Sequence, residues 1–282
     1  MSEADILTMP VDRRRMTQLM ALVPGGLALS PMLGATAAHA ALPFAGSADE
    51  LRAFMKLQSR TDTGYTNYFN AGTVYAAIGG STSVPMYKYE GLLRFHTRVL
   101  GPDLYEVTFI EGGTYLDHKT GQKIDRFLNP VTGKTVAVEH IVEGPMSWRW
   151  TPESLQVKNP IPILSRRVAW QHFVGQSWLH FDNIISAGAA AGPMGHAAAL
   201  VTYSGSTAQL NDKARTRVDD TVLMDSSINP WSPWLQMGDA PGRLANNIIG
   251  RKLGALSGAP KRLLQYLGGK HPKVLGNVET WA

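Results

Sequence analysis

Residues 92–111 have the sequence LLRFHTRVLGPDLYEVTFIE, in which two runs rich in β-branched, aromatic and aliphatic residues flank a turn. This arrangement predicts a β-hairpin. If residues 100–103 form a four-residue loop, Val99 lies opposite Leu104. The face of every other side chain follows from this one pair, because successive side chains of a strand point to opposite faces.

The length of this loop decides which polar side chains lie together. A four-residue loop places these residues on one face: Arg94, His96, Arg98, Tyr105, Phe109 and Glu111. Continued alternation adds Tyr115 to the same face. A five-residue loop instead moves Arg94 and His96 to the face opposite Glu111. The hairpin therefore contains either a cluster of titratable groups or two separate sets.

Similar sequence recurs along most of the chain. Segments rich in Val, Thr, Tyr, Phe and Trp predict antiparallel strands over residues 72–79, 84–99, 104–116, 123–127, 135–142, 146–151, 167–174, 177–185, 198–210 and 220–226. One capped amphipathic helix is expected over residues 48–60. This pattern favours a closed or nearly closed antiparallel β-barrel, lipocalin-like in general shape, because closure removes exposed strand edges. A two-sheet sandwich is the alternative, and a barrel of this size has room for a small ligand.

Two later segments give specific expectations. Gly175-Gln176 is typical of a two-residue type II′ turn, which places Val174 opposite Ser177. One face of that hairpin then has Gln171, Phe173, Trp178, His180 and Asp182. From about residue 241, apolar residues alternate with lysines and arginines, and we expect one or two helices that cover a sheet end or form a subunit contact. A homo-oligomer is therefore one option.

The N-terminus has the three parts of an export signal. Arg13-Arg14-Arg15 precedes a charge-free stretch from Leu19 to Leu33, and Ala38-His39-Ala40 has the small-x-small form of a signal-peptidase site. We expect residues 1–40 to be a twin-arginine type signal peptide and residues 41–282 to form one domain in the periplasm. The charge-free stretch is short and interrupted by proline and glycine, so no stable membrane anchor is expected.

Composition excludes several classes of function. The chain has no cysteine, which excludes disulfides, thiolate metal sites and a thiol nucleophile. Its 27 lysines and arginines are scattered, so the net charge of +5 gives no support for binding nucleic acid. The sequence has no phosphate-binding loop, dinucleotide glycine pattern or helical pair of metal-binding histidines. We therefore expect neither a cofactor nor a metal ion.

Two segments resemble a known family. The first is Glu111-x-x-x-Tyr115-x-Asp117-x-x-Thr120-Gly121, which continues through Asn129-Pro130-x-Thr132-Gly133 to Val136-x-Val138-x-His140. The second starts at Trp231-Ser232-Pro233-Trp234 and ends at Pro241-Gly242. They resemble the bacterial and fungal family called domain of unknown function 1838. The resemblance implies a fold and a region of interest, which includes His140, but no reaction.

Titratable and aromatic residues make up the candidate site. A carboxylate or imidazole can take a proton, a tyrosine can give one, and an arginine can hold an oxyanion. The candidate catalytic residues are Arg94, His96, Glu111, Tyr115 and His140. Aromatic residues, Tyr87 and Tyr89 among them, exceed the needs of the core and suit the walls of a ligand pocket. The candidate substrate-binding residues are Tyr75, Tyr105, Phe109, Asn129, Trp148, Trp150, Trp178, His180, Trp231 and Trp234.

Structural explanations exist for the same residues. The polar face of the first hairpin is equally typical of a solvated surface with an ion pair, and a lone histidine such as His140 is often a hydrogen-bonded structural residue. His180 and Asp182, two residues apart on one strand, have the spacing of an oriented imidazole but also that of an exposed strand face.

Three functions fit these features. The favoured one is a cofactor-independent enzyme that acts by proton transfer on a small apolar, preferably aromatic, compound: a lyase, isomerase, cyclase or hydratase. Release of formaldehyde from a hydroxymethyl-bearing aromatic is one such reaction. The main alternative is a periplasmic barrel that binds a lipid or aromatic ligand without turnover. The third is an envelope protein whose basic C-terminal helices contact a partner.

Overall fold

The computed structural model describes residues 47–79, 83–153, 155–157, 163–186 and 196–281. Only the backbone is described for 155–157, 163–167, 182–186 and 196. The predicted signal peptide lies outside these ranges.

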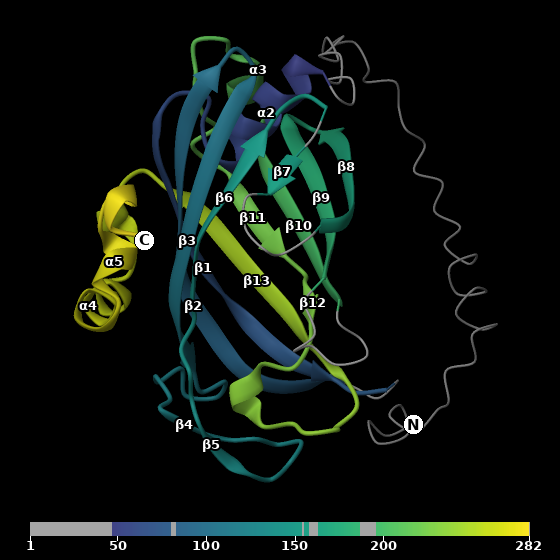
Figure 1. Ribbon diagram of the computed structural model, residues 1–282, viewed down its shortest axis with the longest axis vertical. Coiled ribbons are helices and arrows are strands. Elements are labelled where there is room, and N and C mark those ends of the chain that lie inside the picture. The colour runs from purple at the N-terminus through teal and green to yellow at the C-terminus, as the bar shows by residue number, and fades with distance from the viewer. Residues whose placement is uncertain (1–46, 80–82, 154, 158–162, 187–195, 282) are drawn as a thin grey trace, which may run out of the picture. The chain divides into compact units, whose positions relative to one another are not determined.

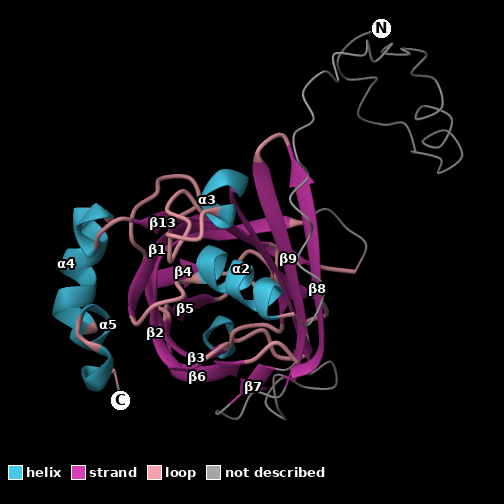
Figure 2. Ribbon diagram, turned by 90° about the horizontal axis from the view of Figure 1, so that it is seen from above, coloured by secondary structure: helices cyan, strands magenta, loops and turns pink. Residues whose placement is uncertain are grey.

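Among the described residues, eleven strands form one sheet with antiparallel pairing, which curls around a helix (Figures 1 and 2). The strands are β1 (Gly64–Ala77), β2 (Val84–Gly101), β3 (Leu104–Leu116), β6 (Val142–Trp150), β7 (Leu155–Val157), β8 (Ile163–Phe173), β9 (Gln176–Ser186), β10 (His196–Ser206), β11 (Val222–Asp225), β12 (Ile228–Asn229) and β13 (Arg243–Leu253). Their order is β7-β6-β3-β2-β1-β13-β11-β10-β9-β8, with β12 beside β10 and β13. A separate hairpin pairs β4 (Arg126–Leu128) with β5 (Thr135–Ala137).

The curled sheet has two free edges, β7 and β8, which do not pair with each other in the described part of the chain. The prediction of a mainly antiparallel β-domain is confirmed, and the sheet is not a closed barrel over the described residues. The last strand, β13, pairs with the first, β1, in the middle of the strand order.

The β2–β3 hairpin differs from the four-residue loop that the sequence favours. Gly101 pairs with Leu104 around a two-residue turn, and an irregularity after Val99 leaves Leu100 as an extra residue. Val99 therefore lies opposite Tyr105, as in the five-residue alternative. Because a one-residue slip reverses the faces, the predicted shared face of Arg94, His96 and Glu111 is wrong.

The β8–β9 turn is also shifted by one position. Val174 and Gly175 have φ angles of 43° and 77° and form the turn, and Phe173 pairs with Gln176. Positive φ at both central residues is the requirement of a type I′ turn, not the predicted type II′. Near the turn, each residue of β8 pairs with a β9 residue two positions from its predicted partner. A shift of two positions keeps every side chain there on its predicted face.

The helix α2 (Ala48–Gln58) lies inside the curled sheet, as Figure 2 shows, where it fills one end. Ser47 caps it as predicted, since its hydroxyl accepts the Glu50 N–H at 3.0 Å. The ring of Phe54 packs against Trp150 at 4.4 Å and Phe181 at 5.3 Å between centroids. This aromatic core occupies the end of the sheet that contains α2.

A buried lysine on β13 holds the C-terminal end of α2. Lys252 Nζ donates hydrogen bonds to the carbonyl oxygens of Lys56 at 3.0 Å, Leu57 at 2.7 Å and Ser59 at 3.3 Å. The last carbonyls of a helix lack partners within the helix and carry partial negative charge, so an ammonium group there is favourable. Lys252 thus connects α2 to the strand that pairs with β1.

The C-terminal region is part strand and part helix. Residues 243–253 form β13, so the prediction of helices from about residue 241 is wrong over that stretch. The helices α4 (Lys261–Lys270) and α5 (Pro272–Leu275) follow and lie beside β2 and β3 on the outside of the sheet (Figure 1). The described residues also form three short 3-10 helices: η3 (Pro233–Leu235), η4 (Leu256–Gly258) and η5 (Val278–Thr280). One further short helix, α3 (Thr207–Asn211), follows β10.

No helix in the described ranges is long and apolar enough to cross a membrane.

We predict that Lys252→Met lowers the free energy of unfolding by about 1–3 kcal/mol, because buried carbonyl groups lose a donor. The measurement is urea denaturation of both proteins. Lys261→Met, which changes an exposed lysine of α4, is the control and should stay within about 0.5 kcal/mol of the wild type. A Lys252→Met protein as stable as the wild type would contradict this role.

Candidate active site

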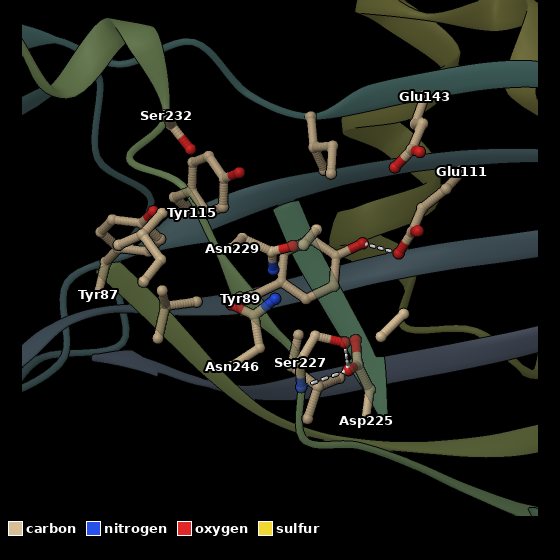
Figure 3. Close-up of a pocket in the computed structure, with 16 residues that line it drawn as sticks. Tyr87, Tyr89, Glu111, Tyr115, Glu143, Asp225, Ser227, Asn229, Ser232 and Asn246 are labelled. Carbon is tan, nitrogen blue, oxygen red and sulfur yellow. Dashed lines mark hydrogen bonds between the residues drawn. The ribbon is translucent and has the colours of Figure 1, made fainter. Parts of the chain in front are cut away.

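A cavity of about 350 Å³ lies inside the sheet, within the usual size range of small-molecule sites. Figure 3 shows the residues that line it. They are Val74, Tyr87, Tyr89, Glu111, Tyr115, Ile141, Glu143, Ala197, Ala199, Asp225, Ser227, Asn229, Ser232, Leu244, Asn246 and Ile248. We call it the carboxyl cavity because its polar wall contains Glu111, Glu143 and Asp225.

Two glycines shape the wall of the carboxyl cavity. Gly91 of β2 pairs with Gly113 of β3, and the ring of Tyr89 lies over both. A Cβ atom at Gly91 would lie 1.7 Å from the Tyr89 hydroxyl oxygen, and one at Gly113 would lie 2.5 Å from the same ring. Only glycine therefore leaves room for Tyr89 to extend along the sheet to Glu111.

Glu111 is the best-defined acid of the cavity. The Tyr89 hydroxyl donates a hydrogen bond to Glu111 Oε1 (Figure 3). Burial, followed by the nearby charge of Glu143, raises the pKa of Glu111 from 4.5 to about 7, although the Tyr89 hydrogen bond opposes this shift. A carboxyl group with a pKa near 7 exists in both protonation states at neutral pH.

Two more carboxyl groups face the same space. Glu143 of β6 lies directly opposite Glu111 of β3, a like-charge pair that destabilises a sheet when both groups are ionised. Asp225, at the end of β11, accepts hydrogen bonds from the Ser227 N–H at 2.8 Å and from the Ser227 hydroxyl. Burial raises the pKa of both Glu143 and Asp225. The Glu143 side chain is nonetheless accessible to water, because its surface lies on the cavity wall.

Tyr115 completes the aromatic side of the cavity. Its side chain is 9% exposed and packs against Tyr87 and Trp234, with ring centroids 4.5 and 5.6 Å away. Its hydroxyl has no hydrogen-bond partner among the described residues, whereas Tyr89 bonds to Glu111. Burial and the charges of Glu111 and Glu143 raise the pKa of Tyr115, so its hydroxyl stays protonated.

The structure brings together two of the five candidate catalytic residues, Glu111 and Tyr115. Arg94 lies on the outer face, where its guanidinium donates to the carbonyls of Val274 and Gly276, both at 2.6 Å. It is also stacked against the rings of Tyr65 and Trp281. The residue instead fixes the C-terminal segment to the sheet.

The two histidines of that set also lie outside the cavity. His96 shares the outer face with Arg94, and its ring packs against Tyr65. His140 is behind Tyr115, where its Nδ1 accepts the Tyr115 backbone N–H at 3.1 Å. Its Nε2 lies 3.6 Å from Asp125 Oδ1. His140 thus supports the backbone of a cavity residue without lining the cavity.

The candidate substrate-binding residues lie around the cavity rather than on its wall. Four of them belong to the aromatic core near α2: Tyr105, Phe109, Trp148 and Trp150. The indoles of Trp148 and Trp150 share one face of β6. Three others are directed away from the interior by strand alternation: Tyr75, Trp178 and His180. His180 bonds to Thr202 at 3.0 Å there, and the side chain of Asp182 is outside the described residues.

The last three candidates close the other end of the sheet. Asn129 is fully buried, and its amide donates to the Leu235 carbonyl at 3.0 Å, so it fixes the β4–β5 hairpin to η3. Trp231 Nε1 donates to the Ala240 carbonyl at 3.0 Å. Trp234 packs directly behind Tyr87 and Tyr115 and supports both cavity tyrosines.

Sequence reasoning missed most of the polar wall. It assigned no role to Glu143, Asp225, Ser227, Asn229, Ser232 and Asn246, and it noted Tyr87 and Tyr89 only as aromatic residues. The alternation around Tyr87, Tyr89 and Gly91 is the one local signal that indicates an inward face. The acids come from strands that only the sheet order brings together.

Within the described ranges, no group of three or more His, Cys, Asp or Glu residues is arranged to hold a metal ion.

Residues 65–278 match the family described as protein of unknown function (DUF1838). The chain belongs to this family. The match confirms the resemblance noted in the sequence and spans every residue of the carboxyl cavity. No functionally curated protein matches the sequence.

Two solved structures are similar to this DUF1838 chain, with low sequence identities and low TM-scores. DynF from the dynemicin biosynthesis pathway of Micromonospora chersina is 8% identical, with 72% of this chain and 85% of that chain covered, at a TM-score of 0.32. An N-terminal dehydratase from the difficidin assembly line is 6% identical, with 74% and 84% covered, at a TM-score of 0.12. Neither likeness carries an argument about this protein.

We predict that Gly91→Ala lowers the free energy of unfolding by about 1–3 kcal/mol, because the new methyl group displaces Tyr89 from Glu111. Urea denaturation measures the loss, and the same change in a Tyr89→Ala background should cost less because the clashing atoms are gone. Gly101→Ala, where a Cβ meets open space, is the matched control. Equal losses for Gly91→Ala and Gly101→Ala would contradict the proposed contact.

We predict that Glu111→Gln stabilises the protein by roughly 1–3 kcal/mol at pH 8 and by much less at pH 5. The folded-state pKa of about 7 is above the ordinary 4.5, so the folded protein binds this proton more tightly. Wild-type stability therefore falls as pH rises between these values, whereas glutamine does not titrate. Urea denaturation at both pH values measures the difference, and the exposed Glu139→Gln variant is the control. A stability difference independent of pH would contradict the raised pKa.

Proposed function

We propose that this protein is a cofactor-independent enzyme that acts by proton transfer on a small, largely aromatic compound. The observation that carries the proposal is Glu111, a carboxyl group with a pKa of about 7 that faces a cavity walled by tyrosines. Acid–base catalysis is most efficient when the pKa of the group lies near the working pH. Buried carboxyl groups with shifted pKa values are also concentrated at active sites.

The neighbours of Glu111 fit this chemistry. Ionised Glu111 acts as the base and removes a proton from the substrate. Tyr89, which donates to Glu111, and the unpartnered hydroxyl of Tyr115 remain protonated because burial raises the pKa of both. The Tyr115 hydroxyl can then donate a hydrogen bond to an oxygen that gains negative charge on the substrate, while the Tyr89 hydroxyl stays bonded to Glu111.

The reaction class is a lyase, isomerase, cyclase or hydratase. One balanced example is loss of formaldehyde from a hydroxymethyl-bearing aromatic. Glu111 takes the hydroxyl proton, the bond between the ring carbon and the hydroxymethyl carbon breaks, and formaldehyde leaves. The ring carbon then takes back a proton from Glu111, so that the enzyme is regenerated. We propose that the reaction takes place in the periplasm, after removal of the N-terminal signal.

We predict that the purified protein converts at least one compound of a panel of small aromatics, detected as an altered mass by mass spectrometry. Glu111→Gln should lower kcat/KM for that compound by about a hundredfold or more, because the base is lost. In the wild type, kcat/KM should rise with pH through an apparent pKa near 7.

The exposed Glu139→Gln variant is the matched control and should retain the wild-type rate. Unchanged turnover in Glu111→Gln would refute the assigned role. A compound that is retained by the protein without alteration would instead support the ligand-binding alternative.

A further inference from the structure

The described lining of the carboxyl cavity has acidic residues but no basic residue. It includes Glu111, Glu143 and Asp225, and none of the described lining residues is a lysine, arginine or histidine. Elsewhere in the chain a buried carboxylate does have cationic partners: Glu106 lies 2.5 Å from Arg98 and 3.4 Å from Arg149. The fold is thus able to supply counter-charges to carboxylates, yet the described residues supply none on the cavity wall.

A second, independent observation indicates that a ligand contacts this wall. Tyr115 is 9% exposed, and its hydroxyl opens on the cavity with no hydrogen-bond partner among the described residues (Figure 3). A polar group in such a place takes its partner from the cavity, as a water molecule or a ligand. Glu143 also has no hydrogen bond or ion pair to any described residue, although it faces the same space.

We propose that the substrate carries a protonated nitrogen, such as the ammonium group of an aromatic amine, which binds between Glu111, Glu143 and Asp225. The proposal rests on the same site as the proposed function and specifies its substrate class. An ammonium group supplies the counter-charge that the wall lacks and donates up to three hydrogen bonds.

The rest of the cavity suits the remainder of such a molecule. Tyr87, Tyr89 and Tyr115 provide aromatic surface for the ring, and their faces also attract a cation. The apolar side chains of Val74, Leu244 and Ile248 extend this surface. A carboxylate-bearing ligand of the same shape would place a fourth negative group beside three acids, so anionic substrates are disfavoured.

The test compares three probes of similar shape that differ in charge: benzylamine, benzyl alcohol and benzoate. Isothermal titration calorimetry of the full chain at pH 8 measures each dissociation constant. Benzylamine should bind about tenfold or more tightly than benzyl alcohol. Its ammonium group makes a charge-assisted hydrogen bond to the carboxylates, whereas the alcohol makes a neutral one. Benzoate should bind most weakly of the three.

Two variants test which residue causes the preference for benzylamine over benzyl alcohol. Glu143→Gln keeps the shape of the side chain and should remove most of the difference between benzylamine and benzyl alcohol, whereas Glu139→Gln should preserve it. The proposal is overturned if benzyl alcohol or benzoate binds as tightly as benzylamine, if no benzylamine binding occurs at millimolar concentration, or if Glu143→Gln retains the full preference. Because binding requires no turnover, this outcome is independent of the Glu111→Gln assay of the proposed reaction.

Discussion

The contact between Lys252 and the end of α2 determines which part of the interior of the sheet is filled by side chains. The ammonium group is buried, and burial lowers the pKa of Lys252 well below its usual value. Three carbonyl oxygens of the helix end offset this cost. With α2 fixed across one end of the curled sheet, the rings of Phe54, Trp150 and Phe181 fill that end. The open volume is therefore confined to the other part of the interior.

Glycines make room for side chains beside that part. Gly250, Asn70, Gly91 and Gly113 occupy paired positions on four adjacent strands, β13, β1, β2 and β3. A Cβ atom at Gly91 or Gly113 would meet the Tyr89 side chain, and one at Gly250 would meet the Asn70 amide. Gly91 and Gly113 thus allow Tyr89 to extend to Glu111. The row therefore permits the hydrogen bond that defines the acid of the cavity.

Much of this fold can be predicted from local sequence, and the site can be predicted only in part. Alternating Val, Tyr, Phe and Trp identify most strands, because they reflect the half-buried surface of a sheet. The extra residue Leu100 in the β2–β3 hairpin leaves no clear local signal, and one slip moved Arg94 and His96 to the wrong face. β13 resembles a helix because Lys252 and Asn246 occupy inward positions where apolar residues are expected.

Glu143 and Asp225 were missed for a different reason. Glu111, Glu143 and Asp225 lie on β3, β6 and β11, and their proximity depends on the order of strands in the sheet, which local patterns do not encode. Glu143 and Asp225 each resemble an ordinary surface residue next to a turn. Glu111 and Tyr115 were predicted from the alternation of the first hairpin, and both also lie in the first segment that resembles the DUF1838 family.

The three acids also bear on the choice between an enzyme and a passive carrier. Burial disfavours the ionised form of each group, and Glu111 and Glu143 repel one another across paired strands. The three acids therefore cost stability when they are ionised together, and Glu111→Gln should lower this cost. A carrier of purely apolar molecules gains nothing from such groups. An enzyme that moves protons, or a site that recognises a cation, uses such groups, which is why we propose these roles for this wall.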